Sequence, residues 1–170
     1  MTVYDGFMGI IRKLVIVATL MLAAATPARA EVGIGFILGK PTGLDLKIDI
    51  ARRSALDMVA GWYPHWRYFD NGGYFHLQWL YQPWEGHGDK VLVPLRLGVG
   101  GAIFDDRNYF HDGHDIDLGV RFPFEVGIRF RGTPVEIYAE IALMFVFFHP
   151  NEPDYGILDL NGGVGLRFMF

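Results

Sequence analysis

The sequence contains no cysteine and a single serine, Ser54, among its 170 residues. The lack of cysteine excludes a disulfide framework, and it also excludes a lipoprotein because no lipid-acceptor cysteine follows the N-terminal segment. Nucleophilic catalysis lacks its nucleophile, since Ser54 falls in a predicted periplasmic turn and Thr42 and Thr133 both fall in turns. We therefore predict no catalytic residue, no enzyme activity and no cofactor.

Long apolar runs are also missing, except within the first thirty residues. There Arg12 and Lys13 precede an apolar segment, and "ARA" at 28–30 fits the pattern at which signal peptidase cleaves. The segment is shorter than the roughly 20 residues that a membrane-spanning helix needs, although an N-terminal anchor is the alternative. We predict a cleaved signal peptide over 1–30 and one mature domain over 31–170.

Basic charge is scarce in the mature domain. The chain has 15 Lys and Arg against 19 Asp and Glu, a formal net charge of −4. The first thirty residues hold three of the basic and one of the acidic residues, which leaves 12 basic and 18 acidic residues from Glu31 onward. Proteins that bind nucleic acid present a basic face, so we expect no nucleic-acid partner.

A period of two dominates the mature domain, and helical periodicity is almost absent. Residues 116–130, for example, place Ile, Leu, Val and Phe on one face and Asp, Gly, Arg and Glu on the other. Eight such segments occur, an even number. They predict an all-β fold, an eight-stranded antiparallel up-and-down transmembrane β-barrel. A soluble sandwich or lipocalin-like barrel, with its apolar face turned inward, is the alternative.

Several features favour the transmembrane barrel. The polar faces combine charged residues with glycine, and small residues leave room for long Arg and Glu side chains in a narrow lumen. Aromatic residues gather near strand ends, as in the girdles of membrane barrels: Trp62, Tyr63 and Tyr74 at one rim, and Trp79, Tyr81, Trp84 and Phe130 at the other. With the N-terminus in the periplasm, the connections 51–54, 82–90 and 131–134 are periplasmic turns. Most of the remaining connections are longer and face outside.

Turn positions predict the register of the strands. Gly132-Thr133 indicates a two-residue hairpin of type II′, because glycine stands at its first central position. The predicted turns place three pairs of side chains opposite each other in the lumen: Arg129 with Glu136, Glu125 with Glu140, and Lys47 with Asp57. The two facing glutamates require a cation, for which Arg96, Arg121 and Arg129 are the candidates.

Two prolines interrupt the fifth and sixth predicted strands. Proline cannot donate to a ladder of hydrogen bonds, and Pro94 and Pro123 are predicted to lie about opposite one another. They mark either paired bulges that bend the wall or a seam that admits lipid from the membrane.

The inward face predicts a lumen filled by polar side chains. An eight-stranded interior is just wide enough for side chains, and buried charges must be paired. The lumen is therefore predicted to be closed, with a narrow pore as the alternative. The predicted lumenal residues are Asp45, Lys47, Asp49, Asp57, His76, Gln78, Arg96, Asp117, Arg121, Glu125, Arg129, Glu136, Tyr138, Glu140, Asp159, Asn161 and Arg167.

Four stretches resemble a family of small bacterial outer-membrane barrels of unassigned function: "GIGFILGKPTGLDLKIDIARRSALDMVAGW", "VPLRLGVGG", "GVRFPFEVGIRFRGTPVEIYAEIA" and "LDLNGGVGLRFMF". In that family a Gly-x-Pro-Thr-Gly turn, here Gly39 to Gly43, joins the first two strands. The resemblance covers essentially the whole mature domain. It implies a barrel similar to those of OmpA and OmpX, located in the bacterial outer membrane, and it assigns no activity.

The remaining candidates concern partners. The motif "HDGHD" could bind a transition metal through His111, Asp112, His114 and Asp115, or it could be a solvated turn. Phe168 and Phe170, on the alternating last strand, resemble the signal that the barrel-assembly machinery recognises. Outer-membrane lipids and lipopolysaccharide are the other expected partners of a monomeric barrel. An enzyme that modifies lipid A, using His76 and a lumenal carboxylate, is a further alternative.

Overall fold

The computed structural model describes residues 31–64, 71–105, 116–148 and 157–170. The predicted signal peptide lies outside the described residues. No helix in the described part of the chain is long and apolar enough to cross a membrane. The eight strands are β1 (Val32–Lys40), β2 (Thr42–Ala51), β3 (Ser54–Pro64), β4 (Asn71–His87), β5 (Val91–Asp105), β6 (Ile116–Phe130), β7 (Val135–Phe148) and β8 (Ile157–Met169).

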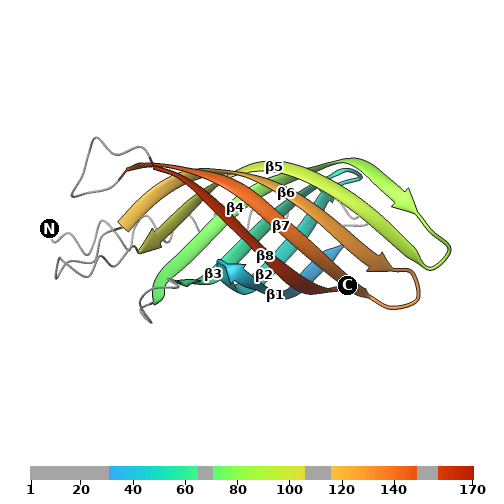
Figure 1. Ribbon diagram of the computed structural model, residues 1–170. Coiled ribbons are helices and arrows are strands. Elements are labelled where there is room, and N and C mark those ends of the chain that lie inside the picture. The colour runs from blue at the N-terminus through green and yellow to red at the C-terminus, as the bar shows by residue number, and fades with distance from the viewer. Residues whose placement is uncertain (1–30, 65–70, 106–115, 149–156) are drawn as a thin grey trace, which may run out of the picture. The chain divides into compact units, whose positions relative to one another are not determined.

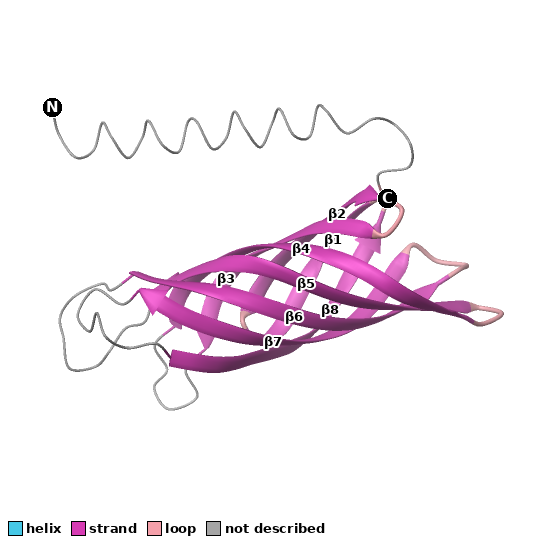
Figure 2. Cartoon of the chain, turned by 90° about the horizontal axis from the view of Figure 1, so that it is seen from above, coloured by secondary structure: helices cyan, strands magenta, loops and turns pink. Residues whose placement is uncertain are grey.

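The strands form a closed barrel in which each pairs antiparallel with its neighbours in the chain (Figure 1; Figure 2). β1 and β8 close it, with Ile34 opposite Phe168. Val32 and Phe170 exchange two backbone hydrogen bonds of 3.1 and 2.8 Å at the end of this seam. The prediction of an eight-stranded antiparallel up-and-down barrel is confirmed.

The two ends of the barrel differ. The end that we call the turn end carries the short turns after β2, β4 and β6, together with Val32 and Phe170. The opposite end, the loop end, carries the β1–β2 turn and the connections 65–70, 106–115 and 149–156, which are outside the described residues. In the β1–β2 turn, Gly39 has a φ of 148°, and the Thr42 hydroxyl donates a 2.9 Å hydrogen bond to the Gly39 carbonyl.

Alternation along the strands separates apolar from charged side chains. Thirty large apolar side chains are exposed on the described chain, far more than a soluble monomer leaves on its surface. In the described strands, no Asp, Glu, Lys or Arg lies on the outer face between the two rims. The charged side chains point into the barrel instead, so the polarity of a soluble protein is inverted.

The predicted turn over 82–90 is wrong, because β4 continues to His87 and the connection is 88–90. The β4–β5 register shifts by one residue between Tyr81, which lies opposite Leu97, and Trp84, which lies opposite Leu95. A bulge exchanges the two faces of a strand. The simple alternation on which the sequence prediction depends therefore breaks at this point, although pairing continues.

The prediction that Pro94 and Pro123 face each other is also wrong. The β5–β6 register places Pro94 across from Gly127 and Pro123 across from Gly98. A Cβ atom at Gly98 would lie 3.0 Å from the Pro123 Cγ, and one at Gly127 would lie 3.1 Å from the Pro94 Cγ. Each ring thus packs on a glycine of the opposite strand. The ladder is interrupted at both prolines, because neither has an N–H group.

Two smaller predictions need correction. Gly132 does not have a positive φ, so the β6–β7 turn is not type II′; Pro134 has no N–H to close such a two-residue hairpin. The predicted register nevertheless holds, with Arg129 opposite Glu136. Tyr74 is not part of a girdle, because it points inward and is buried. The side chain of Tyr63 lies outside the described residues.

Candidate functional site: an ion-paired lumen

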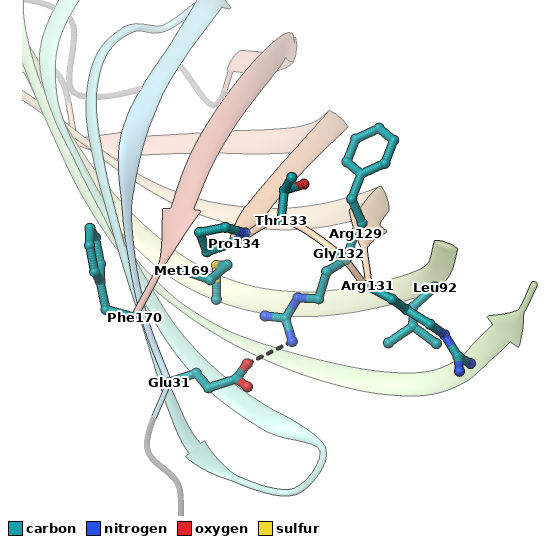
Figure 3. Close-up of a pocket in the computed structure, with 10 residues that line it drawn as sticks. Glu31, Leu92, Arg129, Arg131, Gly132, Thr133, Pro134, Met169 and Phe170 are labelled. Atoms are coloured by element: carbon teal, nitrogen blue, oxygen red, sulfur yellow. Dashed lines mark hydrogen bonds and ion pairs between the residues drawn. The ribbon is translucent and has the colours of Figure 1, made fainter. Parts of the chain in front are cut away.

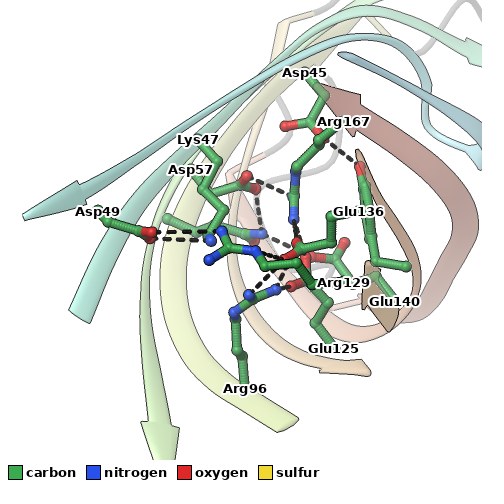
Figure 4. A network of polar contacts seen from close by, with 12 residues as sticks. Asp45, Lys47, Asp49, Asp57, Arg96, Glu125, Arg129, Glu136, Glu140 and Arg167 are labelled. Atoms are coloured by element: carbon green, nitrogen blue, oxygen red, sulfur yellow. Dashed lines mark hydrogen bonds and ion pairs between the residues drawn. The ribbon is translucent and has the colours of Figure 1, made fainter. Parts of the chain in front are cut away.

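Arg167 of β8 is the centre of the polar interior (Figure 4). Its side chain is completely buried and contacts four carboxylates that come from four other strands. The contacts are Nε to Asp45 at 2.6 Å, Nη2 to Asp57 at 2.7 Å, and Nη1 to Glu125 at 2.9 Å and to Glu136 at 3.3 Å. One guanidinium therefore cross-links β2, β3, β6 and β7 to the closing strand.

Arg96 of β5 completes this layer of the network. It binds Glu136 in a bidentate manner, with both N···O distances at 2.8 Å, and it also pairs with Glu125. Bidentate arginine–carboxylate pairs are stronger and more directional than single contacts. The two glutamates thus each contact both arginines, Arg96 and Arg167.

A second polar layer lies closer to the loop end. Gln78 donates to Asp57 at 2.8 Å and to Glu140 at 2.7 Å. Arg121 donates to Glu140 at 2.5 Å and also contacts His76. The sequence predicts Arg121 as a cation for Glu140, and the structure places it there.

Tyr138 of β7 connects the network to the closing seam. Its hydroxyl donates to Asp45 at 2.5 Å, and the Arg167 guanidinium carbon lies 3.7 Å from the centre of its ring. Gly165, directly opposite on β8, leaves the space that the ring occupies. The absence of a side chain at Gly165 therefore lets the Tyr138 ring lie over β8, the strand that pairs with β1.

The change Tyr138→Phe is expected to lower the free energy of unfolding by about 1.5–3 kcal/mol, because a buried hydrogen bond to a charged group is lost. Urea titration of the refolded barrel, followed by its heat-modifiable mobility on a gel, measures this. Tyr81→Phe is the matched control, since Tyr81 is 40% exposed on the outer face. Equal losses in the two variants would show that the hydroxyl of Tyr138 contributes nothing specific.

Inward-facing apolar residues, which the sequence does not predict to be lumenal, form another layer toward the loop end. They form a buried cluster of Tyr74, Ala102, Phe104, Met144 and Val146. A smaller cluster consists of Ile37, Val59 and Tyr138, of which only Tyr138 was predicted to be lumenal. The alternation in the sequence does place Met144 and Val146 on the same face of β7 as Glu136 and Glu140. The inward face was nevertheless not recognised there, because this part of the strand has apolar residues on both faces.

A pocket of about 530 Å³ opens at the turn end (Figure 3). Arg129 lies in its wall and pairs with Glu31 at 2.6 Å, with weaker contacts to Glu136 at 3.4 Å and Asp49 at 3.9 Å. The sequence predicts Arg129 as a partner for the two facing glutamates, but the structure turns it toward the mouth of the barrel. Met169 also lines the pocket.

The other predicted lumenal residues have separate positions. Lys47 lies opposite Asp57 as predicted, yet its ion pair is with Asp49 at 3.0 Å. Asp159 is at the loop end and pairs with Lys40 at 2.9 Å. Two more are buried inside the barrel: Asp117 and Asn161.

The predicted loop metal site of His111, Asp112, His114 and Asp115 lies outside the described residues. Within the described residues, no group of three or more His, Asp or Glu side chains is arranged to hold a metal ion. Phe168 and Phe170 are on the outer face, 47% and 76% exposed. Their role as an assembly signal stays a prediction.

The fold and the interior together define a closed eight-stranded antiparallel barrel with an apolar outer wall and an ion-paired lumen. No model of a known protein family matches the chain. No curated protein matches it either. Among solved structures, it is similar to the N-terminal β-barrel domain of Pseudomonas aeruginosa OprF, with 15% sequence identity and a TM-score of 0.49; the alignment covers 83% of this chain and 96% of that chain.

Proposed function

We propose that this protein is an integral β-barrel of the bacterial outer membrane, with a closed lumen and a structural or interaction role. The observation that carries the proposal is the inverted polarity of the barrel: in the described chain, an outer wall of exposed apolar side chains surrounds thirteen buried polar or charged residues. In hydrocarbon every backbone polar group must be satisfied internally, which a closed barrel achieves. The predicted signal peptide supports export from the cytoplasm.

The closed lumen is supported by the burial of its charges. Arg96, Arg121, Glu125, Glu140 and Arg167 come from four strands and are all at most 4% exposed. Both signs of charge meet at this level, so a hydrated ion would have to break several ion pairs to pass. This arrangement favours the closed barrel over the narrow pore.

Planar-bilayer recording tests this part of the proposal. The purified full-length barrel, inserted in a lipid bilayer, is expected to show no stepwise conductance in concentrated KCl. A bilayer that receives detergent alone is the control. Reproducible steps of a single size, present only with the protein, would contradict a closed lumen and support the pore.

The partners are proposed from the two ends of the barrel. We assign contacts with lipopolysaccharide or with other proteins to the long connections of the loop end, and recognition by the assembly machinery to β8 with its outward Phe168 and Phe170. The lipid A-modifying alternative has little support. Ser54 lies at the turn end, at the start of β3, and His76 is fully buried.

A further inference from the structure

The rim of the turn end has a step between β3 and β4. β3 begins at Ser54, which lies opposite Tyr81, whereas β4 continues to His87 with β5 as its neighbour. The backbone N–H of Gln82 donates to the Arg53 carbonyl at 2.8 Å, and among the described residues no backbone hydrogen bond joins this turn to β4 beyond Gln82. Within the described part of the chain, the edge of β4 beyond this point has no partner strand on the β3 side.

Three amphipathic aromatic side chains lie on the outer face at this step. The rings of Trp79 and Tyr81 stack, with centroids 6.1 Å apart and an angle of 23° between their planes. The bulge after Tyr81 turns Trp84 to the same face, where it is 57% exposed. Gly86 provides room for this indole, since a Cβ there would lie 2.6 Å from it. Tryptophan and tyrosine concentrate at the level of lipid headgroups.

The β2–β3 turn brings two arginines to this step, because the backbone of Arg53 is hydrogen-bonded to Gln82, the residue after Tyr81. Arg52 and Arg53 form the β2–β3 turn and are both exposed, and within the described chain neither side chain has a hydrogen bond or ion pair. The carboxylate of Glu85, on β4 beyond the step, contacts Gln82 at 2.8 Å and His87 at 3.1 Å. The step therefore combines uncompensated positive charge with an apolar aromatic wall.

We propose that this step binds the phosphate of an anionic phospholipid in the adjacent leaflet, held by Arg52 and Arg53. The planar guanidinium matches phosphate geometry, while Trp79, Tyr81 and Trp84 contact the glycerol and the first acyl carbons. The aromatic wall beside the cations favours an amphiphile over free phosphate. The inference rests on the proposed membrane location, because the lipid must surround the barrel.

Native mass spectrometry of the folded full-length barrel tests the site with two probes, phosphatidylglycerol and phosphatidylcholine of equal chain length. The wild-type barrel is expected to prefer phosphatidylglycerol. Arg52→Gln/Arg53→Gln should weaken that binding by about fivefold for each arginine, about 25-fold in total, because each cation near an anionic lipid contributes separately. Binding of phosphatidylcholine should not change.

Lys90→Gln/Arg131→Gln is the matched control, since it removes two exposed cations from the other turns of the same end. It should keep phosphatidylglycerol binding within about twofold of wild type, because Lys90 and Arg131 lie in the β4–β5 and β6–β7 turns and not in the β2–β3 turn at the step. Equal weakening in both double variants would overturn the site. Displacement of the lipid by millimolar inorganic phosphate would also overturn it, in favour of a free-anion site.

Reconstitution into vesicles of either lipid separates this inference from the proposed function. If the barrel does not insert into vesicles, the membrane location fails and the lipid site fails with it. If the barrel inserts but shows no preference for phosphatidylglycerol, the lipid site alone is overturned. The heat-modifiable mobility of each variant on a gel verifies that it is folded before binding is compared.

Discussion

Replacing Arg167 with methionine is expected to lower the free energy of unfolding by about 3–5 kcal/mol, because it leaves buried carboxylates without their cation. Asp45 and Asp57 lose their contacts with the guanidinium, of 2.6 and 2.7 Å. Glu125 and Glu136 keep Arg96 but lose a shared partner. Methionine preserves most of the side-chain volume, so the loss reflects charge and hydrogen bonding more than packing.

Urea titration of the barrel refolded in vesicles measures this loss. Arg131→Met is the control, because it removes the same charge from the exposed β6–β7 turn and should change stability by no more than about 0.5 kcal/mol. Arg167→Lys keeps the positive charge but loses the planar guanidinium with its several N–H donors. Its free energy of unfolding should lie between those of wild type and Arg167→Met. If Arg167→Met does not fold, the role of Arg167 is tested by comparing the free energies of unfolding of Arg167→Lys and Arg131→Met. Equal stability of those two variants would contradict a central role for Arg167.

Leu143→Arg is expected to lower the free energy of unfolding in a bilayer by about 2–4 kcal/mol, because it places a cation at the middle of a lipid-facing strand. Leu143 is 50% exposed on the outer face of β7. Its neighbours across the strands are Phe122 and Leu160, which are exposed as well. The substitution therefore places a charge where the proposal puts hydrocarbon.

The matched variant is Ile116→Arg, at the loop-end start of β6, where the residue is 55% exposed. Near the interface the same change should cost only about 0–1 kcal/mol. Both variants are titrated with urea in vesicles, with tryptophan fluorescence as the signal. A soluble barrel would tolerate arginine equally at both positions, so equal stability of the two would reject the membrane location.

Register could be predicted from the sequence where turns were short and alternation was unbroken. The pairs Lys47–Asp57 and Arg129–Glu136 follow from counting outward from two turns, and both occur in the structure. The prediction failed around Pro83, because a bulge exchanges the faces of a strand and leaves no distinct pattern in the alternating residues.

Register alone did not identify the partners in the lumen. Lys47 is opposite Asp57 but pairs with Asp49, and Arg129 is opposite Glu136 but pairs most closely with Glu31. Long side chains reach several residues along a narrow lumen, so the closest carboxylate is often not the one directly across. The tight interior offers each cation more than one acceptor.

The number of strands, their antiparallel order and the face of most side chains were all readable in the sequence, because the period of two is a local property of an extended backbone. The position of Arg167 among four carboxylates was not. Glu136 lies directly opposite on β7, but Asp45 and Asp57 belong to β2 and β3, which are distant along the chain and reach Arg167 only when β1 and β8 close the barrel. Closure places opposite walls within the reach of one side chain, and that is a property of the tertiary structure alone.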